Sequence, residues 1–229
     1  MSTCCMNKRR IAVIGLGRFG ATMAQEAQAN GMEVLAMDIN EDKVNEIADH
    51  VSEAIIADST NAKAIAAIDW RQFITVVVAI GSDIKNSMMT VIHLQEAGVP
   101  DLWCKVQDKY HASLMKRLGV QRIISPEEEM AKRASLSLRF PDMSQQMLLG
   151  DSQYLAEVKI MQRVDKNDFL HAIRRQGHQL VAINHKQDKH YQPATEVPVC
   201  LYPGDSVLLL SNANESKTRE GFVWPSLTS

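Results

Sequence analysis

The sequence predicts an α/β fold in which a doubly wound parallel sheet is followed by a small α+β domain. Three observations support it. From Arg10 onward, short apolar runs rich in β-branched residues alternate with amphipathic stretches of helical period, as in repeated βαβ units. A glycine-rich loop, Gly15–Gly20, directly follows the first of these runs. The alternation ends near Pro141. Together they indicate a Rossmann-like first domain.

The first domain is expected to contain six strands separated by helices. The expected strands are Ile11–Ile14, Glu33–Met37, Glu53–Ala57, Ile74–Ala79, Leu102–Val106 and Arg122–Ile124. The expected helices are Ala21–Asn30, Glu41–Asp49, Ala62–Ile68, Asp83–Ala97 and Asp108–Leu118. The fourth strand is apolar throughout, which predicts that it is buried on both faces at the centre of the sheet.

A change of pattern near residue 141 predicts a domain boundary. A helix is expected from Pro126 to about Phe140, because proline and an acidic first turn favour a helix start. Pro141 and the cluster Gly150–Ser152 then interrupt the pattern. We therefore expect a nucleotide-binding domain at 8–141, a second domain at 142–212 and a tail at 213–229.

The second domain should be a small α+β unit. Strands are expected at Tyr154–Ile160 and Gln179–Asn184, around a helix at Phe169–Gln176. Val197–Tyr202 and Ser206–Leu210 are expected to form a hairpin that turns on Pro203, Gly204 and Asp205.

Composition limits the classes of function. The formal net charge is -2 with a pI of about 6.4, so no overall attraction to nucleic acid is expected. No apolar run approaches the roughly 20 residues of a membrane-spanning helix, and residues 1–10 lack the apolar core of a secretory signal. We expect a cytoplasmic protein with reduced cysteines. The adjacent Cys4 and Cys5 are given no role.

The loop Gly15-Leu16-Gly17-Arg18-Phe19-Gly20 lies between a strand and a helix, which is where a G-x-G-x-x-G motif binds phosphate. The first glycine permits a tight turn, the second a close approach of backbone to pyrophosphate, and the third the packing of helix on strand. Asp38 ends the second strand, where a carboxylate can accept hydrogen bonds from ribose hydroxyls and repels a 2'-phosphate.

Further nucleotide contacts are expected at the carboxyl ends of the strands, where doubly wound sheets bind ligands. They are Phe19, Ile39, Asp58, Ser59, Ile80, Gly81 and Lys105. Asp58 could face the adenine edge, but capping the next helix explains it equally well. Asn86 lies near the same edge, with no role assigned.

Several segments resemble the RCK family, the regulators of potassium conductance, and most closely its KtrA branch. The resemblance covers about residues 10 to 140 and weakens in the second domain, where it depends mainly on the strand pattern and on Tyr202–Asp205. The similar segments are Ile11–Gly20, Val34–Asp42, Val78–Gly81, Glu96–Val99 and Ile123–Glu127.

The resemblance implies a regulatory subunit that binds ATP or ADP, forms homodimers and assembles into a homo-octameric ring beneath a membrane potassium-translocating subunit of the KtrB or TrkH type. It would then lie at the inner face of the cell membrane. It implies that Arg18 reaches the terminal phosphate bound by the dimer neighbour, and that Glu127 binds a divalent cation, Mg²⁺ or Ca²⁺. Without the resemblance, Arg18 could equally be a surface arginine, and Glu127 part of a helix-start charge cluster.

Two other classes share the glycine loop. An NAD(H)-binding regulator of the TrkA type, or an NAD-dependent oxidoreductase, would also use Asp38. An enzyme would need a domain supplying an acid, a base or a metal, but little chain remains for one and no catalytic motif is found, so we expect no enzyme. The second domain contains four histidines, His171, His178, His185 and His190. We expect them to lie on a solvated polar face, although histidines can also sense pH or bind an anion.

A DNA-binding sensor is the third class, and it would need a basic recognition helix that the sequence lacks. The sequence leaves open whether ATP and ADP act oppositely and whether the second domain binds a second messenger such as cyclic di-AMP.

Overall fold

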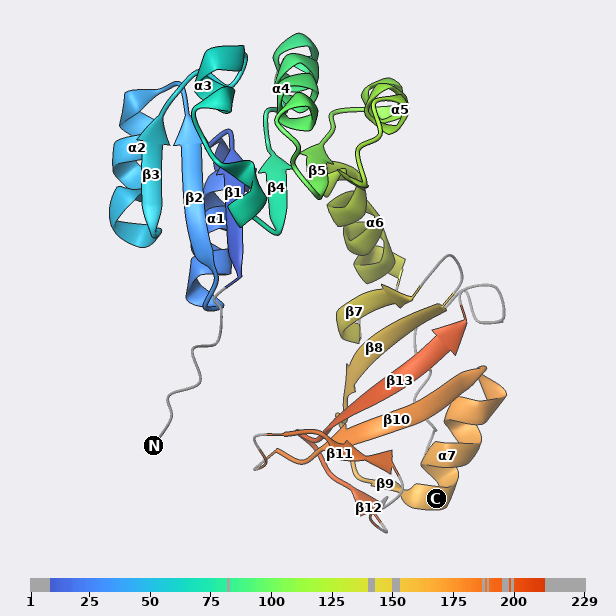
Figure 1. Ribbon diagram of the computed structural model, residues 1–229. Coiled ribbons are helices and arrows are strands. Elements are labelled where there is room, and N and C mark those ends of the chain that lie inside the picture. The colour runs from blue at the N-terminus through green and yellow to red at the C-terminus, as the bar shows by residue number, and fades with distance from the viewer. Residues whose placement is uncertain are drawn as a thin grey trace. The chain divides into compact units, whose positions relative to one another are not determined.

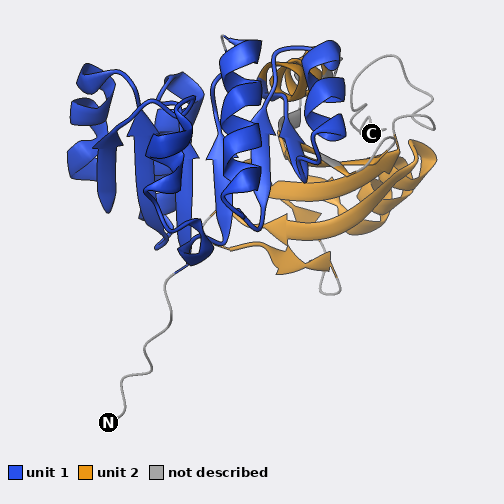
Figure 2. Ribbon diagram, turned by 45° about the horizontal axis from the view of Figure 1, so that its top comes forward, with its two compact units in different colours: residues 1–126 blue, residues 127–229 orange. Residues whose placement is uncertain are grey.

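The computed structural model describes residues 9–81, 83–139, 143–149, 153–186, 188, 190–194, 198 and 200–212. The chain divides into two compact units, Met1–Pro126 and Glu127–Ser229 (Figure 2). The expectations for Cys4 and Cys5, for Pro141 and Gly150–Ser152, and for the tail lie outside the described residues.

The first unit is built on a six-stranded sheet in which all neighbouring strands are parallel (Figure 1). Its strands are β1 (Arg10–Ile14), β2 (Glu33–Asp38), β3 (Glu53–Ile56), β4 (Thr75–Val78), β5 (Leu102–Lys105) and β6 (Arg122–Ile124). The strand order β3-β2-β1-β4-β5-β6 reverses direction between β1 and β4. This confirms the doubly wound, Rossmann-like sheet.

Helices cover both faces of this sheet. They are α1 (Arg18–Ala29), α2 (Glu41–Ile47), α3 (Ala62–Ala66), α4 (Ile84–Glu96) and α5 (Lys109–Arg117), with 3₁₀ turns η1 (Ala48–His50) and η2 (Trp70–Gln72). α1 and α2 contribute to the apolar cluster that contains Val77, and α3, α4 and α5 to the cluster that contains Val76 and Val78. β4 is therefore buried on both faces, as predicted. α1 begins at Arg18, inside the glycine loop, and not at Ala21.

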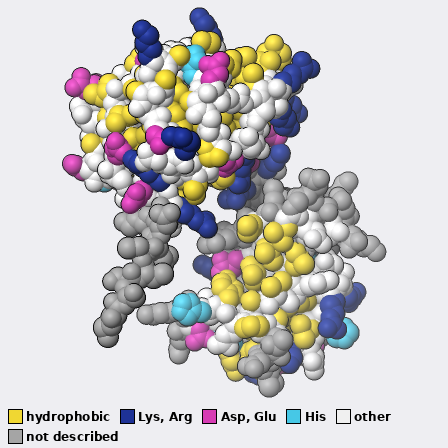
Figure 3. Space-filling model, in the orientation of Figure 1, with side chains coloured by type: hydrophobic (Ala, Val, Ile, Leu, Met, Phe, Trp, Pro, Cys, Tyr) yellow, Lys and Arg dark blue, Asp and Glu magenta, His cyan; other side chains and the backbone are white. Residues whose placement is uncertain are grey.

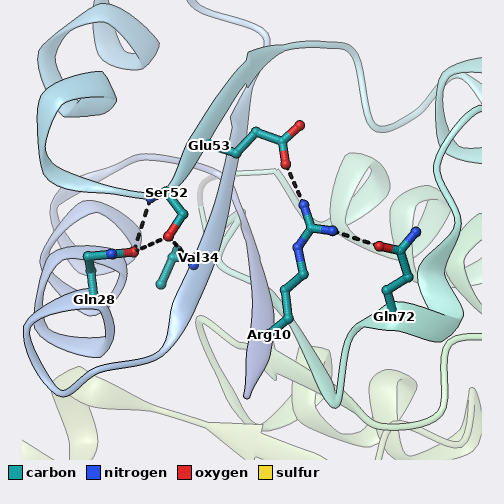
Figure 4. Close-up of polar contacts among 6 residues, drawn as sticks. All are labelled: Arg10, Gln28, Val34, Ser52, Glu53 and Gln72. Carbon is teal, nitrogen blue, oxygen red and sulfur yellow. Dashed lines mark hydrogen bonds and ion pairs between the residues drawn. The ribbon is translucent and has the colours of Figure 1, made fainter. Parts of the chain in front are cut away.

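Polar contacts fasten the amino-terminal edge of the sheet (Figure 4). The guanidinium of Arg10 donates to the side chains of Glu53 and Gln72, and it lies 4.8 Å from the ring centroid of Phe73. The Gln28 side chain accepts hydrogen bonds from the backbone amide and the hydroxyl of Ser52, over 3.0 and 2.8 Å. These contacts lie at the edge of the sheet opposite the glycine loop, which follows the end of β1.

The second unit contains an antiparallel sheet with strand order β11-β10-β13-β8-β7 and a two-stranded sheet of β12 and β9 (Figure 1). Its elements are α6 (Pro126–Arg139), β7 (Met143–Leu149), β8 (Gln153–Lys159), β9 (Val164–Asp165), α7 (Lys166–Arg175), β10 (His178–Asn184), β11 (Gln192–Pro193), β12 (Cys200–Leu201) and β13 (Ser206–Asn212). Phe169 and Ile173 of α7 join the apolar core of the sheet. The expected α+β class is confirmed.

The expected hairpin on Pro203–Asp205 is wrong. β12 pairs with β9, whereas β13 pairs with β8 and β10. The chain does turn there, because the Asp205 carboxylate accepts hydrogen bonds from the backbone amides of Tyr202 and Lys186, over 2.9 and 3.1 Å. That turn passes the chain from one sheet into the other. β7 was not expected from the sequence either.

The compact units divide at Pro126, so that α6 from Glu127 onward is counted with the second unit, whereas the sequence pattern places the boundary at residue 141. In the described residues, no helix combines the length and the apolar character that crossing a membrane requires.

Candidate nucleotide-binding site

Two glycines of the loop are required by the fold itself. Gly15 has a φ of 96°, in the left-handed region that other residues rarely adopt, and its amide donates to the Met37 carbonyl over 2.8 Å. A Cβ on Gly20 would lie 1.9 Å from the Gly15 carbonyl oxygen. A side chain at Gly20 would therefore push α1 away from β1.

Gly17 differs, because nothing in the described chain requires glycine there. Its φ of -68° and ψ of 179° are ordinary, and a Cβ built on it meets no atom within 4 Å. The space beside Gly17 is open. Substitution there would mainly affect whatever approaches the loop from outside.

The start of α1 also lacks a capping side chain. Gly17 occupies its N-cap position without a side-chain hydrogen bond, and the first turn holds no acidic residue. By contrast, α2, α3, α4 and α5 are each capped by a side chain, namely those of Asn40, Asn61, Asp83 and Asp108. The first amides of a helix have no partner within it, so those of α1 are available to an external anion such as phosphate.

Asp38 joins the end of β2 to the glycine loop. Its carboxylate is 9% exposed and accepts hydrogen bonds from the amides of Leu16 (2.6 Å) and Asn40 (2.9 Å). The Lys43 ammonium lies 3.6 Å from the same carboxylate. Because a carboxylate can accept about four hydrogen bonds, capacity remains for ribose hydroxyls.

Asp58 lies in the loop after β3. Its Oδ1 accepts hydrogen bonds from the amide and the hydroxyl of Thr60, over 2.9 and 2.7 Å. The next helix, α3, is capped by Asn61, so the alternative that Asp58 caps it is wrong. Asp58 Oδ2 has no hydrogen-bond partner within the part of the chain that is described. The neighbouring loop carries Ile39, a large apolar side chain that is 67% exposed.

The other side of the site is formed by the ends of β4 and β5. A Cβ on Gly15 would lie 3.1 Å from Ile80 Cγ1, and one on Gly81 would lie 3.1 Å from Lys105 Nζ. Lys105 Nζ lies 5.8 Å from the ring centroid of Phe19. The structure thus brings Phe19, Ile80, Gly81 and Lys105 close to the glycine loop, between β1 and β4 where the strand order reverses.

Arg18 lies in the first turn of α1 and is exposed. Its guanidinium makes no hydrogen bond or ion pair to any other described residue. Asn86 is also exposed, and its backbone amide donates to the Asp83 cap of α4 over 3.0 Å.

The family comparison covers this whole unit. The model of the TrkA-N domain matches residues 11–126. Ktr system potassium uptake protein A of Bacillus subtilis is 35% identical over 193 residues, covering 83% of this chain and 87% of that protein. The chain belongs to the TrkA-N family, among its KtrA-type RCK members.

A second relative supports this membership, and a solved structure shares the fold. Ktr system potassium uptake protein C of Bacillus subtilis is 38% identical, again over 83% of this chain and 87% of its own length. Among solved structures, the GsuK RCK domain aligns with 93% of this chain and 47% of its own chain, at a TM-score of 0.62 and 11% identity. At that identity the likeness concerns the fold alone, and it extends over both units.

Glu127, the expected metal ligand of this TrkA-N chain, is the first residue of the second unit. Glu127 is exposed in the first turn of α6, in the second unit. Within the described residues, no group of three His, Cys, Asp or Glu side chains is arranged to hold a metal ion.

Three residues near the site were missed by the sequence analysis: Lys43, Ser87 and Thr90. Thr90 and Ser87 are fully buried on α4, where Thr90 lies 2.8 Å from the Ser59 hydroxyl and Ser87 lies 3.4 Å from Cys104 Sγ. Burial raises the pKa of the Cys104 thiol to about 11, so this sulfur stays neutral. Ser87 and Thr90 could have been found from the sequence, because they are two hydroxyl residues, three positions apart, within an apolar helical stripe.

Proposed function

We propose that the chain is a regulatory subunit of a potassium uptake system, in which adenine nucleotides control a membrane potassium-translocating subunit of the KtrB or TrkH type. The observation that carries the nucleotide part of this proposal is the uncapped start of α1, with open space at Gly17 beside the Asp38 carboxylate. The relatives of known role are named as Ktr potassium uptake proteins, which supports a regulator and not an enzyme.

In the proposed complex the phosphates bind the first amides of α1 and the ribose hydroxyls bind Asp38. The adenine ring lies against the exposed Ile39, with its edge toward Asp58. Lys105 and Gly81 face the phosphate side, together with Ile80 and Phe19. The ammonium of Lys105 would offset phosphate charge there.

Arg18 is proposed to act across a homodimer. Its guanidinium has no partner among the described residues, and a guanidinium offers a planar fork of donors that suits phosphate. A third phosphate extends beyond the helix-start amides, so an arginine from the neighbouring subunit could bind it. ATP would then draw two subunits together in a way that ADP cannot, and ligand identity would change the geometry of a homo-octameric ring.

Glu127 is proposed to bind a divalent cation, Mg²⁺ or Ca²⁺, through oxygen. A single exposed carboxylate is a weak site alone. The phosphate oxygens of a bound nucleotide would complete the set of hard ligands that both ions prefer.

The second unit has a surface suited to assembly with a second copy. Figure 3 shows hydrophobic side chains gathered on its visible face. Its sheet carries exposed apolar residues, Met147 and Leu149 on β7 and Val181 on β10, and apolar side chains that gather at a surface favour protein contacts. We propose a dimer at least, so light scattering that gives only a monomer at micromolar concentration, with and without nucleotide, would contradict the model.

Calorimetric titration of nucleotide-free protein with ATP, ADP, NAD and NADH tests the ligand class. We expect ATP and ADP to bind more tightly than either dinucleotide. The structure of the GsuK channel bound to NAD shares the fold, at a TM-score of 0.61 and 12% identity. Tighter binding of NAD or NADH would support the NAD(H)-binding TrkA-type regulator instead.

A further inference from the structure

The buried face of α4 carries two hydroxyl groups among apolar residues. Ser87 and Thr90 are both fully buried, beside Val91 and Leu94 on the same helix. A buried hydroxyl is costly unless it forms a hydrogen bond. The hydrogen-bond partners of Ser87 and Thr90 therefore show which neighbouring segments α4 stabilises.

Each partner is adjacent in sequence to an expected nucleotide contact, and Ser59 is itself one of the expected contacts. Thr90 Oγ1 lies 2.8 Å from the hydroxyl of Ser59, which follows Asp58. Ser87 Oγ lies 3.4 Å from the sulfur of Cys104, which precedes Lys105. One turn of α4 thus contacts the chain beside both ends of the candidate site.

The hydrogen bond between Thr90 and Ser59 helps to fix the orientation of the neighbouring Asp58 carboxylate. Ser59 is 7% exposed, and its hydroxyl bonds inside the protein to that of Thr90. On the other side, Asp58 Oδ1 is held by the amide and the hydroxyl of Thr60. With Ser59 fixed to Thr90 and Oδ1 fixed to Thr60, the second carboxylate oxygen has a defined position.

We propose that Thr90 is a positioning residue for adenine recognition: through Ser59 it holds Asp58 so that Oδ2 accepts a hydrogen bond from the exocyclic amine of adenine. This rests on the proposed nucleotide site. Hypoxanthine has a carbonyl oxygen in place of that amine. Inosine diphosphate should therefore bind more weakly than ADP, and the ratio of the two affinities measures how well Oδ2 is placed.

The first arm of the test checks the adenine contact itself. In Asp58→Asn, Oδ1 still accepts from Thr60, so the amide nitrogen replaces Oδ2 and presents a donor to the base. We expect the ADP to inosine diphosphate ratio to fall about tenfold or more, the usual scale for a hydrogen bond to a charged group. An unchanged ratio would show that Asp58 does not contact the adenine amine, and the proposed role of Thr90 would then be wrong as well.

The second arm isolates Thr90. Thr90→Val keeps the shape and removes the hydrogen bond, so the ratio should fall about threefold or more, and Thr90→Ser should restore it. Combined with Asp58→Asn, Thr90→Val should cause no further fall, because both changes act on one contact.

Ser87→Ala is the matched control, because it removes a buried hydroxyl from the same helix face but leaves Ser59 bonded. It should lower the unfolding temperature and leave the ratio unchanged. If Thr90→Val does not fold, Ser59→Ala removes the same hydrogen bond. A ratio that responds to Asp58→Asn but not to loss of the Ser59–Thr90 bond, or that falls equally in Ser87→Ala, overturns the proposal while leaving the nucleotide site intact.

Discussion

The carboxylate of Asp38 accepts a hydrogen bond of 2.6 Å from the backbone amide of Leu16. This bond joins the residue expected to bind ribose to the loop expected to bind phosphate. Both residues are buried, at 9% and 4% exposed, so water competes little for it. Asp38 therefore serves the protein twice, as an internal acceptor and as a candidate ligand.

Replacement of Asp38 should consequently affect both binding and stability. In Asp38→Ala, ADP binding should weaken by about 1.5 to 3 kcal/mol through loss of a charged acceptor. The unfolding free energy should fall by about 1 to 3 kcal/mol, because the buried Leu16 amide loses its partner. Calorimetric titration and urea denaturation measure the two effects.

Asp42→Ala is the control for Asp38. Asp42 is an exposed acid in the first turn of α2, so its loss should leave ADP affinity nearly unchanged. Unchanged ADP affinity in Asp38→Ala would falsify the assigned ribose contact.

Alanine substitutions at Gly17 and Gly20 should affect different properties: the first should mainly weaken ADP binding, and the second should mainly lower the unfolding free energy. Gly17→Ala places a Cβ in open space, so the unfolding free energy should change by no more than about 1 kcal/mol, while ADP affinity should fall about tenfold or more as the methyl group obstructs the phosphate. In Gly20→Ala the Cβ meets the Gly15 carbonyl, and a loss of about 3 kcal/mol or more is expected.

Thermal unfolding and titration of both glycine variants test this division. If Gly17→Ala binds ADP as the wild type does, no ligand approaches the start of α1 closely, and the proposed phosphate position is wrong.

Arg18→Ala should reduce the ratio of ATP affinity to ADP affinity and leave ADP binding nearly intact. The physical reason is that only the third phosphate extends to an arginine from the neighbouring subunit. A loss of about 1.5 to 3 kcal/mol in ATP binding is the expected scale for a charged hydrogen bond. In cells, potassium uptake at low external potassium should fall without a fall in protein abundance.

Arg117→Ala controls for net charge, because Arg117 is an exposed arginine in the last turn of α5. It should leave the ATP to ADP ratio unchanged. If Arg18→Ala keeps the wild-type ATP to ADP affinity ratio and wild-type potassium uptake, Arg18 is only a surface residue and the proposed contact is wrong.

The second unit should lose stability as the pH falls below about 6.5. His178 is 4% exposed, with its ring nitrogen 2.7 Å from the Ser211 hydroxyl, so the expected solvated face is wrong for this histidine. Burial lowers the pKa of His178 from its usual 6.5. The unfolded chain then binds the proton more readily, so the stability present above pH 6.5 is lost as pH falls through the lowered pKa.

Urea denaturation of the wild type and His178→Gln between pH 7.5 and 5 tests this, over a range chosen to span the usual histidine pKa of about 6.5. The variant should show a shallower loss of stability toward low pH. His171→Gln, at an exposed position on α7, should keep the wild-type dependence. Burial also lowers the pKa of His111 in the first unit, so part of the dependence should remain in both.

Local pattern predicted most of the first unit. The β-branched run around Val76–Val78 indicated a central strand because burial on both faces requires continuous apolar sequence, and the glycine spacing indicated the phosphate loop. The pattern failed at Met143–Leu149, since the segment Met-Ser-Gln-Gln-Met-Leu-Leu lacks the β-branched and aromatic residues typical of strands. It failed again at Pro203–Asp205, because a turn signal does not specify the partner strand.

The sequence by itself determined the fold class, the glycine loop and the acid at the end of β2, because strand periodicity and backbone freedom are local properties of the chain. Only the tertiary structure decided that Asp38 bonds to Leu16, that Asn61 and not Asp58 caps α3, and that Ser59 turns inward to Thr90. Hydrogen bonds between residues far apart in sequence depend on which loops the sheet order brings together, and that order is set by packing of the whole unit.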